Sequence, residues 1–333
     1  MSRVIEAVPM PRRWSTAREN ALQAGLQLIG IGAVYVIIVI FFSFATEHFF
    51  TYSNGINVLT NVTVIGIVAI GQTIAIISGG FDLSVSGVVP LGAVSFAILT
   101  NAGWPVTLAI MMVLLIGASV GVVNGLVVTI VGINPLIATL GTLSITSGLA
   151  YTLSKGVTIP FQNRGAGVLA DKTAGGISYY VLLLLFLSIV GFVMLRYTVF
   201  GRMLYAIGGN REASRLAGMR VNLVTVLVYV TCSALAALAG VVVASQLLAG
   251  SATVGSQAAL QSIAAVILGG AALTGGVGGI PGTLIGVLVL GTVSNGMALM
   301  QVPAFYQQIA TGSILLLAVA FGRLRNILVG EQS

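Results

Sequence analysis

Long apolar runs dominate this 333-residue sequence and decide what it can fold into. Hydrophobic residues make up 57% of the chain and charged residues only 6%, whereas roughly a quarter of a soluble domain is charged. A run of about 20 apolar residues can cross a bilayer as a helix, and backbone groups in lipid need hydrogen bonds within the chain. We therefore predict an all-α polytopic membrane protein with about ten transmembrane helices, at residues 26–45, 56–78, 84–100, 105–131, 135–153, 179–195, 223–248, 258–273, 281–300 and 304–321.

The arginines and lysines orient these spans, because cytoplasmic loops carry an excess of both. Of the 14 basic residues, four lie in the N-terminal segment, five at 196–220 and two near the C-terminus. With ten spans these eleven fall on one side, so we predict that the N- and C-termini are cytoplasmic. The other three, Lys155, Arg164 and Lys172, fall in one external loop at 154–178.

These charges divide the chain into a cytoplasmic tail at 1–27, a transmembrane domain at 28–322 and a second cytoplasmic tail at 323–333. Glu47 and His48 follow the first apolar run in place of a small-residue cleavage site. We therefore expect a retained first helix and not a signal peptide.

A basic interval at 197–222 is the longest polar stretch with helical patterning. Asn210 suits a helix N-cap, and Glu212 would lie in the first turn, where the helix dipole favours a negative charge. Gly218 can close the helix in a left-handed conformation. We predict a short basic helix between two spans, preceded by a sharp turn at Gly208-Gly209.

Three ordered motifs carry a resemblance to a known family. The first is Phe200-Gly201-Arg202 with Ala206-Ile207-Gly208-Gly209-Asn210, Ala213 and Arg215-Leu216-Ala217-Gly218-Met219; the second is Gly79-Gly80-Phe81-Asp82-Leu83-Ser84-Val85; the third is Ile263-Ala264-Ala265-Val266-Ile267-Leu268-Gly269-Gly270 with the glycine-rich stretch to Gly286. Together they resemble the permeases of sugar-type ATP-binding cassette importers, the ribose, xylose and arabinose group. The resemblance implies a subunit of the bacterial cytoplasmic (inner) membrane that moves a small neutral polyhydroxylated solute by alternating access.

The resemblance also implies partners. The basic interval would dock into a cleft of an ATP-hydrolysing subunit, which would hold ATP and Mg, while this chain would carry no cofactor. A second permease chain, identical or paralogous, would complete the path, and a periplasmic-type sugar-binding protein would dock on the external loop. The alternative is that this loop is simply solvated. The residues expected to serve ATPase coupling are Gly201, Arg202, Gly208, Gly209, Asn210, Glu212, Ala213, Arg215, Ala217 and Gly218.

Catalytic groups are scarce in this sequence. Neither lysine belongs to a phosphate-binding Gly-Lys-Ser/Thr motif, and the single histidine and single cysteine fit no nucleophile–base arrangement. We therefore do not expect an enzyme. Apart from Asp82, the predicted spans and their short connections contain almost no acid or base, and we expect Asp82 to be the N-cap of the third span. Two alternatives stay open: an ion-coupled secondary carrier that uses Asp82, and a branched-chain amino-acid permease.

Neutral polar side chains within the spans are candidates for the solute path. Amides and hydroxyls suit a monosaccharide, although such groups also commonly join helices in lipid. With Asp82, the candidates are Asn61, Gln72, Asn124, Asn295, Gln301, Tyr306 and Gln307.

Glycine spacing predicts close helix packing. Gly117, Gly121 and Gly125 recur every fourth residue, which would let a second helix backbone approach along one face. The glycine-rich segment 269–282 is expected to be a tight cytoplasmic turn between two helices, with a gate hinge as the alternative.

Overall fold

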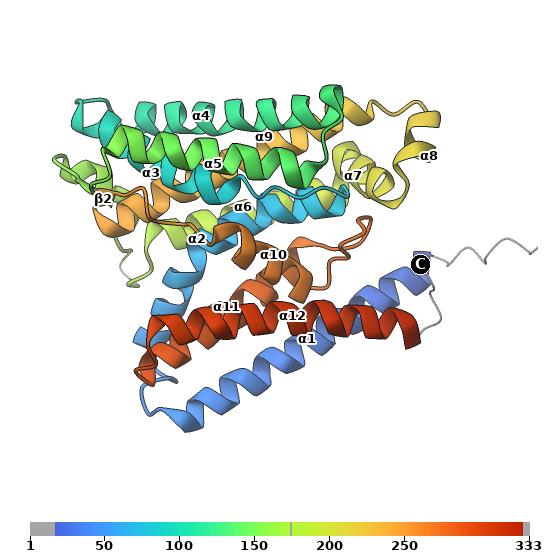
Figure 1. Cartoon of the computed structure of the whole chain (residues 1–333). Coiled ribbons are helices and arrows are strands. Elements are labelled where there is room, and N and C mark those ends of the chain that lie inside the picture. Colours follow the sequence, from blue (N-terminus) through green and yellow to red (C-terminus); the bar gives the residue numbers. More distant parts are fainter. Residues whose placement is uncertain (1–16, 174, 329–333) are drawn as a thin grey trace, which may run out of the picture.

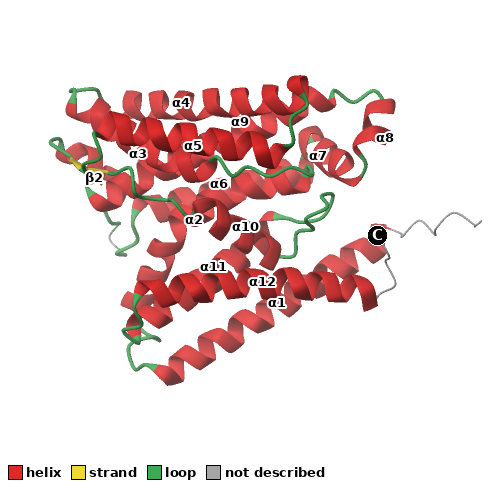
Figure 2. Ribbon diagram, viewed as in Figure 1, coloured by secondary structure: helices red, strands yellow, loops and turns green. Residues whose placement is uncertain are grey.

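The computed structural model describes residues 17–173 and 175–328, which form a bundle of roughly parallel helices (Figure 1). Among these residues the strands are the short pair β1 and β2 (Figure 2). The helical elements are α1 (Ala17–Ala45), α2 (Tyr52–Ile77), α3 (Val85–Asn101), α4 (Val106–Leu126), the π-helical turn η1 (Val127–Val131), α5 (Pro135–Ser154), the 3-10 helix η2 (Arg164–Ala170), α6 (Tyr179–Tyr197), α7 (Val199–Gly209), α8 (Arg211–Leu216), α9 (Val221–Leu247), α10 (Ala258–Leu268), α11 (Ile280–Leu299) and α12 (Ala304–Leu328). The two strands are β1 (Ile159–Pro160) and β2 (Ala249–Gly250).

Each of the ten predicted apolar runs contains a helix. Seven described segments are long and apolar enough to cross a membrane, in α1, α2, α4 with η1, α5, α6, α9 and α11. The chain is therefore an all-α polytopic membrane protein, apart from the two-residue strands.

The predicted span at 258–273 needs correction. Helix α10 ends at Leu268 and has 11 residues, so at 1.5 Å per residue it covers about half of a hydrocarbon core. Helix α3 is also short, with 17 residues. Non-helical segments at 78–84 and 251–257 precede these two helices.

The two short helices meet at their N-terminal ends. The backbone N–H of Ala259 in α10 donates to Ser86 Oγ in α3 at 2.9 Å. This bond satisfies a backbone donor at a helix start, where no partner exists within the helix itself.

Helix α9 lies at the centre of the core and packs against α2, α3 and α4. The predicted glycine face of α4 makes this packing close. A Cβ atom added to Gly121 would lie 2.4 Å from the carbonyl oxygen of Tyr229, and one added to Gly125 would lie 2.7 Å from Cα of Val226. The prediction of backbone-to-backbone packing at these glycines is confirmed.

The glycine-rich segment 269–282 contains the connection between α10 and α11, as predicted for a tight turn. Its two ends touch, because a Cβ atom on Gly282 would lie 2.0 Å from the carbonyl oxygen of Gly269. Figure 1 shows this connection at the end of the bundle that carries α7 and α8. Helix α1 begins and α12 ends at this same end.

The 154–178 loop lies at the opposite end and is hydrogen-bonded to the helix bundle. Strand β1 pairs antiparallel with β2, and Asn101 Nδ2 donates to the carbonyl of Pro160 at 2.9 Å. Ser245 Oγ donates to the carbonyl of Ala166 at 3.0 Å, and Tyr52 Oη donates to that of Gly175 at 2.5 Å. Helices α2, α3 and α9 therefore hold this loop in place.

Candidate functional site: the α7–α8 segment and its anchor

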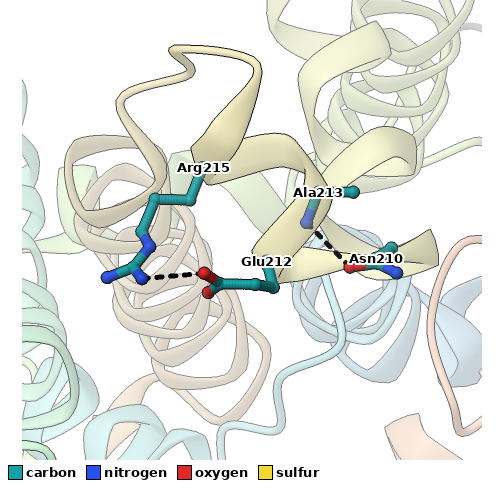
Figure 3. A network of polar contacts seen from close by, with 4 residues as sticks. All are labelled: Asn210, Glu212, Ala213 and Arg215. Carbon is teal, nitrogen blue, oxygen red and sulfur yellow. Dashed lines mark hydrogen bonds and ion pairs between the residues drawn. The ribbon is translucent and has the colours of Figure 1, made fainter.

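The predicted basic helix is α8, and both of its ends are capped as expected. Asn210 Oδ1 accepts a hydrogen bond from the Ala213 N–H at 2.8 Å (Figure 3). At the other end Gly218 has φ +83°, and the N–H of Met219 donates to the carbonyl of Ser214 at 3.1 Å. This left-handed closure is the Schellman motif, which needs a residue without the steric cost of a side chain.

Most of α8 is exposed. Ser214 is the one buried residue in α8, while Ala213 and Ala217 are exposed and 79% of the Leu216 surface is accessible. Glu212 and Arg215 form an exposed ion pair at 2.8 Å across one helical turn (Figure 3). Such a pair adds a few tenths of a kcal/mol at most, so α8 presents its small apolar residues without covering them.

Five basic residues lie in or next to the α7–α8 segment. Arg196, Arg202, Arg211, Arg215 and Arg220 are all exposed. A shallow hollow of about 220 Å³ lies beside the C-terminal end of α8, between Arg215 and Leu223. The segment therefore combines positive charge, small exposed residues and a concavity on one end of the bundle.

Helix α7 was not predicted as a separate element. Its signal is the apolar spacing of Phe200, Met203, Leu204 and Ile207, which is helical. Thr198 caps it by accepting from the Gly201 N–H at 3.1 Å. A Cβ atom on Gly201 would lie 2.3 Å from the carbonyl oxygen of Leu195, so Gly201 lets α7 fold back against the end of α6.

The prediction of a sharp turn at Gly208-Gly209 is wrong. Both residues belong to α7, and neither is among the positive-φ glycines. A Cβ atom on Gly208 would instead lie 1.8 Å from the carbonyl oxygen of Ile77 and 2.6 Å from the nitrogen of Gly276. Glycine is needed here because three backbones touch, not because the chain turns.

We call this contact the glycine junction: Ile77–Gly79 at the end of α2, Gly208–Gly209 at the end of α7, and Gly275–Gly276 in the α10–α11 connection. The Gly276 N–H donates to the carbonyl of Ile77 at 2.9 Å. A Cβ atom on Gly275 would lie 2.9 Å from Cα of Gly79. Segments from all three sequence motifs therefore meet at one place.

Tyr205 adds a side-chain bond to the junction. Its hydroxyl donates to the carbonyl of Gly278 at 2.9 Å. Burial raises the pKa of the Tyr205 phenol, and the nearby Arg196 guanidinium offsets this in part. The phenol therefore stays protonated and able to donate at neutral pH.

A buried polar cluster lies behind the junction, around the turn that joins α2 to α3. Asp82 is fully buried, and its Oδ1 accepts from the Ser84 N–H at 2.9 Å and from the Ser84 hydroxyl. Asn124 Nδ2 in α4 donates to Ser84 Oγ at 2.9 Å, and the Thr142 hydroxyl in α5 donates to Asn124 Oδ1 at 2.6 Å. Ser233 Oγ in α9 donates to Asp82 Oδ2 at 3.3 Å.

The prediction that Asp82 is the N-cap of α3 is wrong. Ser84 occupies that position, and Asp82 lies two residues earlier, where its carboxylate accepts the Ser84 N–H in a local turn. The sequence predicted that Asp82 lies near the start of α3, but it did not predict which residue is the N-cap.

The structure separates the solute-path candidates into two groups. Gln72, Asp82 and Asn124 are fully buried inside the chain, and Asn295 is nearly so. Asn61, Gln301 and Tyr306 are exposed, while Gln307 is half-buried and its Oε1 accepts from Ser294 Oγ at 2.8 Å. Asp82 and Asn124 are joined in one network through Ser84, and Cys232 Sγ donates to Gln72 Oε1 at 3.7 Å on the same side of α9.

Comparison of the sequence with known proteins identifies its family. Residues 54–319 match the family described as the permease component of the branched-chain amino acid transport system. The chain belongs to this permease family. The match includes the glycine junction, α8 and the buried polar cluster.

Relatives align along most of the permease. The chain is 37% identical over 303 residues to the ribose import permease protein of Bacillus subtilis, covering 90% of this chain and 94% of that protein. It is 37% identical to the L-arabinose ABC transporter permease protein of Azospirillum brasilense, covering 89% and 88% of the two chains. The L-arabinose transport system permease of Escherichia coli K12 is 34% identical, covering 89% and 90%. No solved structure matches the chain.

Family membership and the seven long apolar helices make the chain a multi-pass permease of the bacterial inner membrane.

Proposed function

We propose that this permease is the membrane-spanning subunit of an ATP-driven importer for a monosaccharide or a similar neutral polyhydroxylated solute. The observation that carries the proposal is the exposed α8, whose neighbour α7 is joined to α2 and to the α10–α11 connection at the glycine junction. The named ribose and arabinose permeases support a sugar as the solute.

Partner ATPase subunits would bind ATP and Mg and grip α8 from the cytoplasm. Movement of α8 would reach the bundle through α7, because Gly208 touches both Ile77 and Gly276 without intervening side chains. Close packing of this kind passes the displacement of one helix to its neighbours, because tightly packed interiors do not deform smoothly. ATP binding would thereby switch access to the solute path from outside to inside.

The proposed topology has ten crossings, two of which combine a short helix with a non-helical segment. The end that carries α8 and the ends of α1 and α12 would face the cytoplasm. The opposite end would face outward, and its 154–178 loop would receive a soluble sugar-binding protein. The bonds that tie this loop to α2, α3 and α9 support a preformed docking surface. A second permease chain would complete the path.

The experiment is the substitution Ala213→Asp in the tagged permease, followed by purification from its native membrane. Ala213 is exposed, so the added carboxylate should leave the thermal midpoint of the permease unchanged. We expect loss of a co-purifying ATPase and loss of ATP-dependent ribose or arabinose uptake. Ala102→Asp, at an exposed position at the opposite end of the bundle, is the matched control and should retain the ATPase. Normal ATPase recovery and uptake in Ala213→Asp would show that α8 is not the docking element.

A further inference from the structure

The non-helical segment 251–257 lies along α3. A Cβ atom added to Gly250, just before the segment, would lie 2.6 Å from the carbonyl oxygen of Ala93 in α3. Just after the segment, the bond from the Ala259 N–H to Ser86 Oγ joins the start of α10 to the start of α3. Figure 1 shows the segment between β2 and α10, within the length of the bundle. In the proposed topology it therefore lies at membrane depth.

This depth restricts what can cover the segment. Irregular backbone at membrane depth is tolerated only where it is buried in protein or lines a water-filled cavity, because lipid offers its polar groups no hydrogen bonds. The segment is not fully buried in this chain, since Thr253 and Ser256 are exposed. Its exposed side must therefore face water or another protein chain, and not lipid.

Helix α5 lies next to the segment on α3. Ala252 of the segment and Ala150 of α5 belong to one buried cluster. A Cβ atom added to Gly87, near the start of α3, would lie 3.0 Å from Ser147 Oγ in α5. The neighbouring residue Ser86 is the one that bonds to the start of α10. The segment, the start of α10 and α5 therefore border one another.

Hydroxyl and amide side chains gather where these elements meet. Thr142 of α5 bonds to Asn124 and thereby marks the side of α5 that faces α4. Ser144 and Ser147 lie roughly opposite Thr142 around the helix, at about 100° per residue. We call the following uncharged residues the polar face: Ser144 and Ser147 of α5, Thr253, Ser256 and Gln257 of the segment, and Gln261 of α10. All six are exposed or half-buried.

The polar face differs from the exposed sides of other helices. Exposed side chains include Leu185 and Phe186 on α6, and Met111 and Leu115 on α4, as expected for helices in contact with lipid. The polar face instead offers hydrogen-bond donors and acceptors without charge, which match the hydroxyl groups of a neutral sugar. A path for such a solute needs bonding groups that stay open to water, so water is the cover that fits this chemistry.

We propose, on the basis of the proposed function, that the polar face lines the water-filled path of the importer and bonds to the sugar as it crosses. Thr253 and Ser256 contribute hydroxyls from the non-helical segment, and the serines of α5 contribute theirs from beside it. A second permease chain would present the same face across the path. The fully buried Gln72, Asp82 and Asn124 would then join helices and not contact the solute.

The test is the rate at which a small, positively charged methanethiosulfonate reagent modifies single cysteines in the assembled importer, in membranes made permeable to the reagent. Background is low because the native Cys232 is fully buried. Ser256→Cys is the variant. Thr253→Cys is a second variant with the same expected rate, and it keeps the test valid if Ser256→Cys does not fold.

The matched control is Leu115→Cys, on the exposed apolar side of α4. Its depth is similar, because Cβ atoms added to Gly117 of α4 and to Gly92 of α3 would both meet Ala237 of α9. We expect Ser256→Cys to react at least about tenfold faster than Leu115→Cys, because the thiolate is the reactive form and lipid disfavours a charged group. Modification should stop ATP-dependent ribose or arabinose uptake by Ser256→Cys and leave that by Leu115→Cys unchanged.

Three other outcomes are informative. Rates for Ser256→Cys and Thr253→Cys as slow as that for Leu115→Cys would overturn the proposal and mean that lipid or a second chain covers the polar face. Fast modification of Ser256→Cys that leaves sugar uptake intact would also overturn it. Fast modification in a permease that imports no sugar even without substitution would contradict the proposed function and still support a water-filled path.

Discussion

The adjacent glycines Gly208 and Gly209 have different structural roles. Gly208 touches the backbones of Ile77 and Gly276, whereas a Cβ atom on Gly209 would meet nothing within 4 Å. Gly218 is a third case, because its φ of +83° requires a left-handed backbone. The role of Gly218 could be predicted from its position after a short helix. The role of Gly208 could not, since its neighbours lie more than 60 residues away on either side.

This difference predicts a sharp contrast between two single-methyl substitutions. Gly208→Ala should force α7 away from α2, and overpacking of this kind typically costs about 1–3 kcal/mol. We expect a lower thermal midpoint and loss of ATP-coupled sugar uptake, measured in detergent and in reconstituted vesicles. Gly209→Ala is the control and should be tolerated, because the added methyl group meets open space and the backbone conformation suits alanine. Equal behaviour of the two variants would contradict the close contact at the glycine junction.

At the scale of elements, the turn from α2 to α3 connects the glycine junction to the membrane helices. Gly79 touches the α10–α11 connection, and Asp82, three residues later, is joined through Ser84 and Asn124 to α4 and directly to α9. The sequence indicated that Asp82 matters, because a lone carboxylate among apolar runs is costly. The other members of its network come from α4, α5 and α9, so the sequence alone did not identify them.

The geometry of Asp82 predicts a structural and not an ion-coupling role. Asp82→Asn keeps the oxygen that accepts from the Ser84 N–H, and its new NH₂ group can donate to Ser233 Oγ. We expect nearly normal stability and sugar uptake. Asp82→Ala removes both acceptors and leaves the buried Ser84 N–H unpaired, which should cost about 1–3 kcal/mol. Thermal midpoints and uptake rates in reconstituted vesicles check both variants. A well-folded Asp82→Asn variant without transport would support an ion-coupled carrier.

At the scale of the whole molecule, the two ends of the bundle differ in chemistry. One end carries α8, which is rich in arginine, and the other carries the bonded 154–178 loop (Figure 1). The positive-inside rule predicts that the arginine-rich end faces the cytoplasm. The geometry supports the use of each end for a different partner.

Cysteine labelling tests this orientation with little background, because the native Cys232 is free and fully buried. A membrane-impermeant maleimide should label Ala213→Cys in inside-out vesicles but not in intact spheroplasts. Gln162→Cys, exposed in the loop at the other end, should show the opposite pattern. Unsubstituted permease is the control for background. Labelling of both variants from the same side would mean that one of the proposed crossings is absent.

Local interactions and hydropathy determined much of this protein from the sequence alone. The ten apolar runs became helices because lipid leaves the backbone no other partners, and α8 has both predicted caps because capping depends on residues only a few positions apart. Tertiary structure decided the rest: the short length of α10, the closeness of three backbones at Gly208, and the network around Asp82. These features depend on contacts between residues far apart in the chain, and local sequence does not specify which distant backbone or side chain will arrive there.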